Sequence, residues 1–111
     1  MSIETRAIMD RLREMGLLVR TRGELPPRID EVTDDSRAAR AGSLFVAVRG
    51  SARDGHDFLP AVAQQGAAAA IVEDESRTSL PAIVVSDARR AAAAAAAVRH
   101  GDPARKLTLV G

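Results

Sequence analysis

The sequence predicts an α/β protein, a single three-layer domain with a mostly parallel or mixed sheet flanked by helices. First, apolar runs of strand length alternate with helical patterns along the chain. Second, the runs SLFVAV, AAAAIV and AIVV are uniformly apolar, which is typical of strands that are buried on both faces. Third, 111 residues suit one ordinary domain. Helices on both faces of the sheet are the expected result.

The N-terminal part of the chain is predicted to be a helix followed by a mobile connector. Apolar residues recur near helical spacing over residues 3–15, with Ser2 as the expected cap and Gly16 as the expected stop. Residues 17–27 contain a glycine and two adjacent prolines, which favour a short extended piece and a turn. A short strand is expected over residues 29–33, followed by a polar turn that could reach a ligand.

The remaining elements alternate as an α/β fold requires. Each apolar run is followed by a cap, a helical pattern or a turn. Asp57 is the expected N-cap of the middle helix and Ser86 that of the last helix. The predicted elements are a strand over 43–49, a helix over 57–65, strands over 67–72 and 82–85, and a helix over 87–99.

Composition excludes several classes of function. The 16 basic and 15 acidic residues are interspersed, so we expect neither a nucleic-acid nor a membrane partner. The absence of cysteine excludes a disulfide framework and a thiolate zinc site. The N-terminus lacks a signal-peptide pattern, and no apolar run approaches the ~20 residues that span a bilayer. A cytoplasmic protein is therefore expected.

The segment GSARDGHD, residues 50–57, has the glycine spacing of a phosphate-binding loop. It follows a predicted strand and precedes a predicted helix, where backbone amides face an anion. His56 and Asp57 stand where a nucleotide hydrolase needs lysine and a serine or threonine. The pattern therefore indicates binding of a phosphate group without its hydrolysis.

The segment TDDSRAARAGSLFVAVRGSARDGHDFLPAVAQQGAAAAIVED, followed by PAIVV and HGDPARKLTLVG, resembles the N-terminal, UDP-sugar-binding domain of the Mur ligases. The resemblance covers residues 32–111 and is strongest to the peptidoglycan ligases that add the third peptide residue to UDP-N-acetylmuramoyl-L-alanyl-D-glutamate. It implies an N-terminal helix and connector at 1–30, a substrate-binding domain at 31–105, and at 106–111 the first strand of an ATP-binding domain absent from this chain.

The resemblance also implies a site. Its substrate contacts fall on Asp34, Ser36, Ser51, Ala52 and Arg53. In some family members a His-Gln-Ala-like triplet stands where this chain has Ser-Ala-Arg, so the location is implied more strongly than the contacts. The implied ligand is UDP-N-acetylmuramoyl-L-alanyl-D-glutamate, and the implied partners are the missing central and C-terminal domains of the same ligase. ATP and magnesium are expected only for the full-length ligase, so this chain alone should be inactive.

Other interpretations of these residues remain open. Ser36 can close a turn, and Arg53 can be a solvated loop charge. His56 with its neighbouring aspartates could suggest a metal site, but side chains so close in sequence do not easily converge on one ion, and we expect none. Both phenylalanines, Phe45 and Phe58, lie in apolar patterns and are expected in the core. No catalytic residue set is visible.

Two alternative functions also remain open. The chain could be a free-standing nucleotide- or phosphate-binding module, or the N-terminal domain of the ligase that adds the D-alanyl-D-alanine dipeptide, whose members also carry DGHDF-like segments. Within the third-residue ligases, the choice between diaminopimelate and lysine is made in a domain that this chain lacks.

Overall fold

The protein folds into three layers around one mixed sheet. The computed structural model describes residues 3–49 and 54–99. The sheet has the strand order β2-β7-β6-β5-β4, in which β4 to β7 are parallel and β2 is antiparallel to β7. This confirms the predicted fold class. The strands are β2 (Leu18–Arg22), β4 (Glu31–Thr33), β5 (Ser43–Val46), β6 (Ala69–Val72) and β7 (Ala82–Val85), and β1 (Ile3–Glu4) pairs separately with β3 (Arg28–Ile29).

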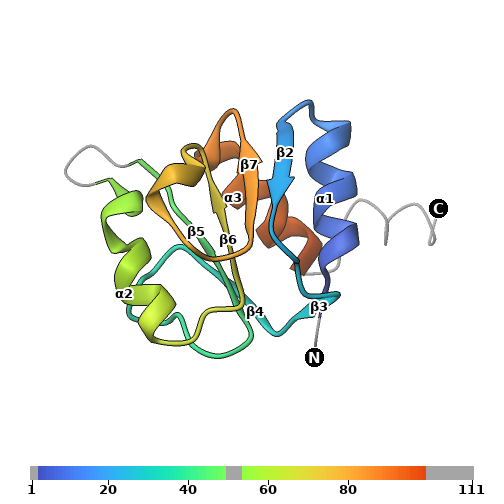
Figure 1. Cartoon of the computed structure of the whole chain (residues 1–111). Coiled ribbons are helices and arrows are strands. Elements are labelled where there is room, and N and C mark those ends of the chain that lie inside the picture. Colours follow the sequence, from blue (N-terminus) through green and yellow to red (C-terminus); the bar gives the residue numbers. More distant parts are fainter. Residues whose placement is uncertain (1–2, 50–53, 100–111) are drawn as a thin grey trace.

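Helices cover both faces of the sheet. Figure 1 shows α2, in green, on one side and α1, in blue, with α3, in red, on the other. No helix among the described residues is long and apolar enough to cross a membrane. The helices are α1 (Thr5–Glu14), α2 (Leu59–Gln64) and α3 (Ala88–Arg99), with short 3-10 turns η1 (Gly55–Phe58) and η2 (Glu75–Arg77).

The sheet separates two apolar layers because successive side chains of a strand point to opposite faces. In β5, Leu44 and Val46 face α1 and α3, whereas Phe45 faces α2. The same alternation continues in β6 and β7, whose residues are all buried. Uniform burial on both faces explains why these strands are continuous apolar runs in the sequence.

The alanine tract forms α3, which packs on one face of the sheet. Ala88, Ala91, Ala94 and Ala95 of α3 are buried in the layer shared with α1. Alanine is a strong helix former, and its small side chain lets a helix approach its neighbours closely. The prediction that this tract is structural is confirmed.

The N-terminal helix ends as predicted but begins later. Gly16 has φ +71°, its N–H donates to the Arg13 carbonyl, and the N–H of Leu17 donates to the Leu12 carbonyl. These two bonds are a Schellman motif, which glycine favours in the left-handed conformation. The helix begins at Thr5 because Ile3 and Glu4 pair with β3 instead. The expected cap, Ser2, lies outside the described residues.

The segment expected as a mobile connector contains a strand. β2 pairs along its length with β7 and forms one edge of the main sheet. The expected extended piece is confirmed as β2, whereas the mobility is not, because residues 18–22 are part of the hydrogen-bonded ladder. Its middle residues Val19, Arg20 and Thr21 are exposed, so the segment carries little of the apolar signal that marks the buried strands.

The caps of the later helical segments differ from the prediction. Asp54, not Asp57, caps η1 by accepting from the N–H of His56. Asp87, not Ser86, caps α3, because its Oδ1 accepts from the N–H of Arg90 at 3.1 Å. In both cases two polar residues near the start could serve, and the backbone path selects between them.

Candidate functional site

The candidate site lies at the carboxyl ends of the parallel strands. Because β4 to β7 run in the same direction, the residues that follow them gather at one edge of the sheet. Asp34 follows β4, Glu73 follows β6 and Ser86 follows β7. Ligands of open α/β sheets bind at this edge.

A polar pocket of about 540 Å³ opens at this edge. It lies between the TDDSR turn after β4 and the end of η1. Its lining residues are Asp34, Asp35, Ser36, Arg37 and Phe58. Two residues predicted for the site, Asp34 and Ser36, therefore line one cavity. The other three, Ser51, Ala52 and Arg53, lie outside the described residues.

The TDDSR turn is held by Thr33 and Asp35. Thr33 Oγ1 accepts from the N–H of Asp35 at 3.0 Å, and Asp35 Oδ1 accepts from the N–H of Arg37 at 2.9 Å. The bond from the Arg37 amide is the main cause that holds the pKa of Asp35 below its usual value, and the Arg37 side chain adds to it. Arg37 thus pairs with Asp35.

The side chains of Asp34 and Ser36 are not used to close this turn. Within the described part of the chain, no hydrogen bond involves either side chain. The interpretation of Ser36 as a turn closer is therefore not supported, because its neighbours provide that closure. A carboxylate and a hydroxyl are left to face the pocket.

A second, smaller pocket adjoins the first at Asp34. It has a volume of about 190 Å³ and lies where β4 and β5 meet α3. Its lining residues are Val32, Thr33, Asp34, Val46, Ala92 and Ala96. The two cavities thus share one carboxylate, and each has both polar and apolar lining residues, an arrangement suited to an organic ligand with both kinds of surface.

The GSARDG segment is closed at its base by backbone pairing. The N–H of Gly55 donates to the Val48 carbonyl at 2.8 Å, and Arg49 forms an antiparallel bridge with Asp54. A Cβ at Gly55 would lie 2.6 Å from the Val48 nitrogen. Glycine at position 55 therefore allows one backbone segment to approach another.

The amides at the start of η1 are already bonded within the protein. Asp54 Oδ1 accepts from the N–H of His56 at 2.9 Å, and the N–H of Asp57 donates to the Asp54 carbonyl. The expectation that this helix start faces a bound anion is wrong for these amides, because a carboxylate holds the position. The same bond from His56 is the main cause of the lowered pKa of Asp54.

His56 is a buried structural residue, and its side chain has no exposed surface. Its Nδ1 lies 2.7 Å from Asp54 Oδ1, and its Nε2 accepts from the N–H groups of Glu73 at 3.1 Å and Asp74 at 3.3 Å. Both ring nitrogens are thus engaged in hydrogen bonds. Among the described residues no cluster of potential ligands could hold a metal ion.

Glu73 joins the ends of three elements. Its Oε2 accepts from the N–H of Ala88 at 2.8 Å, at the start of α3, and its Oε1 lies 3.5 Å from Arg49 Nε. Arg89 of α3 donates in turn to the Arg49 carbonyl at 3.3 Å. Carboxylates therefore occupy the start of α3 as well as the start of η1. These internal hydrogen bonds fix the positions of the segments at this edge of the sheet.

The comparisons with known proteins agree with this architecture. The model of the Mur ligase family, catalytic domain, matches residues 28–107. This range includes the main sheet from β4 onward, η1, α2 and α3. The chain belongs to the Mur ligase family.

Relatives with assigned names are ligases of peptidoglycan precursors. The UDP-N-acetylmuramoyl-L-alanyl-D-glutamate--2,6-diaminopimelate ligase of Bacillus velezensis is 40% identical over 85 residues, which is 77% of this chain and 17% of that protein. The UDP-N-acetylmuramyl-tripeptide synthetase of Roseiflexus sp. is 44% identical over 88 residues, with the same two coverages. This chain therefore spans about one sixth of the length of these relatives.

A solved structure has the same fold. The UDP-N-acetylmuramoylalanyl-D-glutamyl-2,6-diaminopimelate--D-alanyl-D-alanyl ligase from Acinetobacter baumannii matches with a TM-score of 0.72 and 25% identity. The match covers 89% of this chain and 22% of that protein.

Phe58 is only in part the core residue that its apolar pattern predicts. It packs against the apolar cluster that contains Phe45, but it is half-buried and also lines the pocket with the TDDSR turn. The apolar pattern around it gave no sign of this, because an aromatic residue at the rim of a pocket and one in a core look alike in sequence. Phe45, by contrast, is fully buried as predicted.

Proposed function

We propose that this chain binds UDP-N-acetylmuramoyl-L-alanyl-D-glutamate as the substrate-binding part of an ATP-dependent ligase that adds the third residue of the peptidoglycan peptide. Membership of the Mur ligase family supports the class. The names of the relatives from Bacillus velezensis and Roseiflexus sp. support this step of the pathway, since both act in formation of the tripeptide.

The pocket lined by Asp34 and Ser36 is the observation that carries the proposal. Its described residues supply two carboxylates, a hydroxyl, an aromatic ring and the guanidinium of Arg37, which pairs with the Asp35 carboxylate and leaves that of Asp34 unbalanced. Carboxylates accept hydrogen bonds from hydroxyl and N–H groups and repel phosphate. We therefore assign this side of the site to the uridine or sugar part of the ligand. Ser51, Ala52 and Arg53 remain the proposed contacts to the diphosphate.

ATP and magnesium belong to other parts of such a ligase. His56 and Asp57 replace the lysine and hydroxyl residues that a phosphate-binding loop needs for phosphoryl transfer. Buried His56 is bonded to Asp54 and to the end of β6, so its ring is not available to a nucleotide. We expect this chain to bind its ligand without turning over ATP.

The ligase that adds D-alanyl-D-alanine is the competing assignment within the family, because the solved structure from Acinetobacter baumannii carries that name. Identity is 25% to that protein but 40% and 44% to the two third-residue relatives. The higher identities favour the third-residue step. Tighter binding of the UDP-linked tripeptide than of the dipeptide would reverse this assignment.

Titration by NMR tests the proposed function. UDP-N-acetylmuramoyl-dipeptide, UDP and uridine are added in turn to the isotope-labelled 111-residue chain. We expect the amides of Asp34–Arg37 and Phe58 to shift, with the sugar nucleotide binding more tightly than uridine. Equal affinity for UDP and uridine, or shifts confined to residues remote from the pocket, would contradict the proposal and favour a different binding module.

Replacement of Ser36 gives a sharper test of the pocket. Ser36→Ala removes one neutral hydrogen bond to the ligand, so binding should weaken by about 0.5–1.5 kcal/mol. Ser79→Ala is the matched control, because Ser79 is an exposed serine near the opposite end of β7. Ligand affinity is measured for both variants by titration. Equal loss in the two variants would show that Ser36 does not contact the ligand.

A further inference from the structure

The buried His56 of the DGHDF segment connects the residue before η1 with the residues that follow β6. Its backbone N–H and its ring both reach Asp54, and its Nε2 accepts from the amides of Glu73 and Asp74 at the end of β6. Within the described residues, these two amides donate to no other acceptor. The ring thus serves as the acceptor for the two amides that follow β6, in place of a carbonyl from a neighbouring strand.

The hydrogen bonds determine the form of the ring. Two N–H groups donate to Nε2, so this nitrogen carries a lone pair and the proton is on Nδ1, which donates to Asp54. Only a neutral imidazole in this tautomer satisfies all three contacts. A protonated ring, or one with its proton on Nε2, would direct N–H against N–H.

This ring also determines where one wall of the pocket lies. His56 and Phe58 belong to the same short turn, η1, and the His56 carbonyl accepts from the N–H of Leu59 as α2 begins. Phe58 lines the pocket opposite Asp34 and Ser36. A shift of η1 away from β6 would therefore move Phe58 relative to the TDDSR turn.

We propose that His56, as the neutral tautomer with its proton on Nδ1, is a positioning residue for the substrate pocket. It holds η1 against the end of β6 and so fixes the distance across the pocket from Phe58 to the TDDSR turn. The ring itself does not touch the ligand. This inference rests on the proposed function for the identity of the ligand, but its structural part stands on the contacts of the chain alone.

The tautomer is measured first, in the wild-type chain. Long-range proton–nitrogen correlation of the imidazole distinguishes a protonated Nδ1 from a protonated Nε2. We expect an unprotonated Nε2 and a protonated Nδ1 at neutral pH. The reverse tautomer would overturn the proposal without any variant being made.

Two substitutions then separate positioning from bulk. In His56→Gln the side-chain amide reaches the place of Nε2 and can accept from β6, whereas in His56→Asn it reaches only the place of Nδ1. We expect His56→Asn to weaken binding of UDP-N-acetylmuramoyl-dipeptide by about tenfold, because the two amides lose their acceptor, and His56→Gln to recover most of that loss. Ile8→Val, a buried change on α1, is the control for general loosening and should leave affinity within about twofold.

Binding is measured at a temperature at which circular dichroism shows every variant folded. Wild-type affinity in His56→Asn, or equal losses in the Asn, Gln and Ile8→Val variants, would overturn the proposal. If the wild-type chain binds none of the UDP compounds, the proposed function fails, and the ligand-free spectra decide the role of His56. In that case the amide signals of Phe58 and Ser36 must still shift in ligand-free His56→Asn. Unchanged signals would overturn the positioning role of His56.

Discussion

Asp54 and Gly55 show how single residues shape the neck of the GSARDG segment, by which we mean the paired backbone of residues 47–49 and 54–55. Asp54 pairs with Arg49 on one strand of the neck and accepts from His56 beyond it. Gly55 packs its α-carbon against the backbone of Val48 and Ala47. One of the two glycines that gave this segment the spacing of a phosphate-binding loop, Gly55, is therefore explained by packing within the protein. The same glycine spacing can arise from close approach within the chain as well as from approach to a ligand.

Alanine at position 55 tests this close approach. A Cβ there would lie 2.6 Å from the Val48 nitrogen and 2.7 Å from its carbonyl oxygen, and backbone atoms cannot move aside cheaply. We expect Gly55→Ala to lower the free energy of unfolding by about 1–3 kcal/mol, as overpacking does. Urea unfolding measures the loss, and amide shifts at Val48 locate it.

Gly16→Ala is the matched control for Gly55→Ala. Gly16 has open space around its missing Cβ, so alanine there acts only through the left-handed backbone. It should be destabilising without shifting the amides of Val48 or Ala47. A Gly55→Ala chain that unfolds at the wild-type urea concentration would show that the neck is looser than the structure indicates.

At the scale of elements, buried strands could be predicted from sequence and the edge strand could not. β5, β6 and β7 are buried along their whole length, and their apolar runs identified them. β2 exposes its middle residues and pairs with β7, whose partner residues lie 60 to 67 positions further along the chain. The residues of a short sequence window do not reveal a strand partner so far away in the chain. The strand was therefore predicted only as an extended piece in a connector.

The candidate site was predictable to a similar extent. The residue pattern predicted a polar turn after a strand that could reach a ligand, and the resemblance to the Mur ligases singled out Asp34 and Ser36 within it. Phe58 escaped prediction because its role depends on where η1 ends relative to the turn after β4, which is a tertiary relation. The role of His56 was missed for the same reason, since its partners Glu73 and Asp74 are 17 and 18 residues away.

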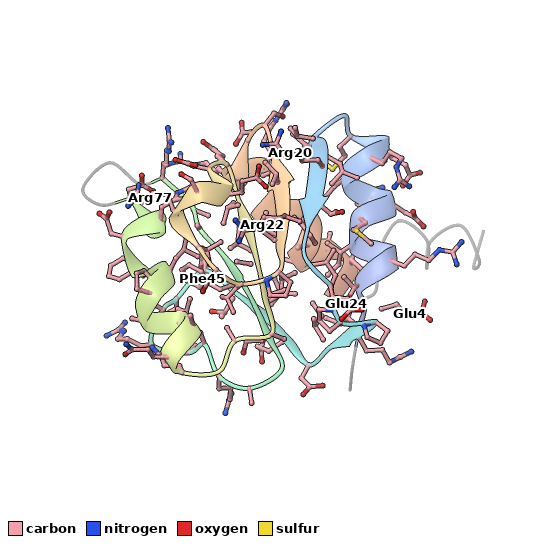
Figure 2. The ribbon with its side chains drawn as sticks, in the orientation of Figure 1. Glu4, Arg20, Arg22, Glu24, Phe45 and Arg77 are labelled. Carbon is pink, nitrogen blue, oxygen red and sulfur yellow. The ribbon has the colours of Figure 1, made fainter. Side chains whose placement is uncertain are left out.

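Arg22 ties β2 to the segment that precedes β7. Its guanidinium donates to the carbonyls of Glu75 at 2.7 Å and Leu80 at 2.9 Å, and also to that of Thr78. Figure 2 labels Arg22 and Arg20 on the same strand. Arg22→Ala removes the donor for three carbonyls, so we expect a loss of about 1–3 kcal/mol in the free energy of unfolding.

Arg20→Ala is the matched control on the same strand. The Arg20 guanidinium pairs with the Glu75 carboxylate, with its Nε 2.9 Å from Oε1, but its side chain is 60% exposed. Exposed ion pairs contribute little because solvent screens them. The thermal midpoint should therefore fall clearly in Arg22→Ala and hardly at all in Arg20→Ala. Equal midpoints in the two variants would contradict a special role of Arg22.

At the scale of the whole molecule, Phe45 lies at the centre of the layer between the sheet and α2. It is fully buried in the middle of β5, in the apolar cluster that contains Leu59 and Val62, and Figure 2 shows it on the α2 side. Phe45→Ala should lower the free energy of unfolding by about 3–5 kcal/mol, because it leaves a cavity. That is a large part of the ~5–15 kcal/mol that a domain possesses.

Phe58→Ala is the comparison that separates core from pocket. Phe58 is half-buried, so its truncation should cost less stability than that of Phe45 while changing the wall of the pocket. Chemical unfolding compares the two chains. If Phe45→Ala unfolds within the error of the wild-type chain, the layer beneath α2 does not stabilise the domain as described.

Stability as a function of pH is a property of the whole carboxylate set. Hydrogen bonds are the largest cause of the lowered pKa of four acidic groups, Asp35, Asp54, Asp74 and Glu75. A group with a lowered folded pKa stabilises the fold above its unfolded pKa, about 3.9 for Asp and 4.3 for Glu, and loses that contribution as the pH falls through the folded value. These groups therefore leave the thermal midpoint unaffected by pH near neutrality and lower it below about pH 4.

Asp54→Asn tests how much of this acid sensitivity comes from the neck. Asparagine keeps a carbonyl oxygen that can accept from the N–H of His56, but it does not titrate. The variant should therefore lose less stability than the wild-type chain between about pH 4 and pH 2. Asp10→Asn is the control, since the exposed Asp10 pairs only with Arg13 of its own helix. Thermal unfolding across this range compares the three chains, and an Asp54→Asn chain with the wild-type slope would show that Asp54 is not a source of the acid sensitivity.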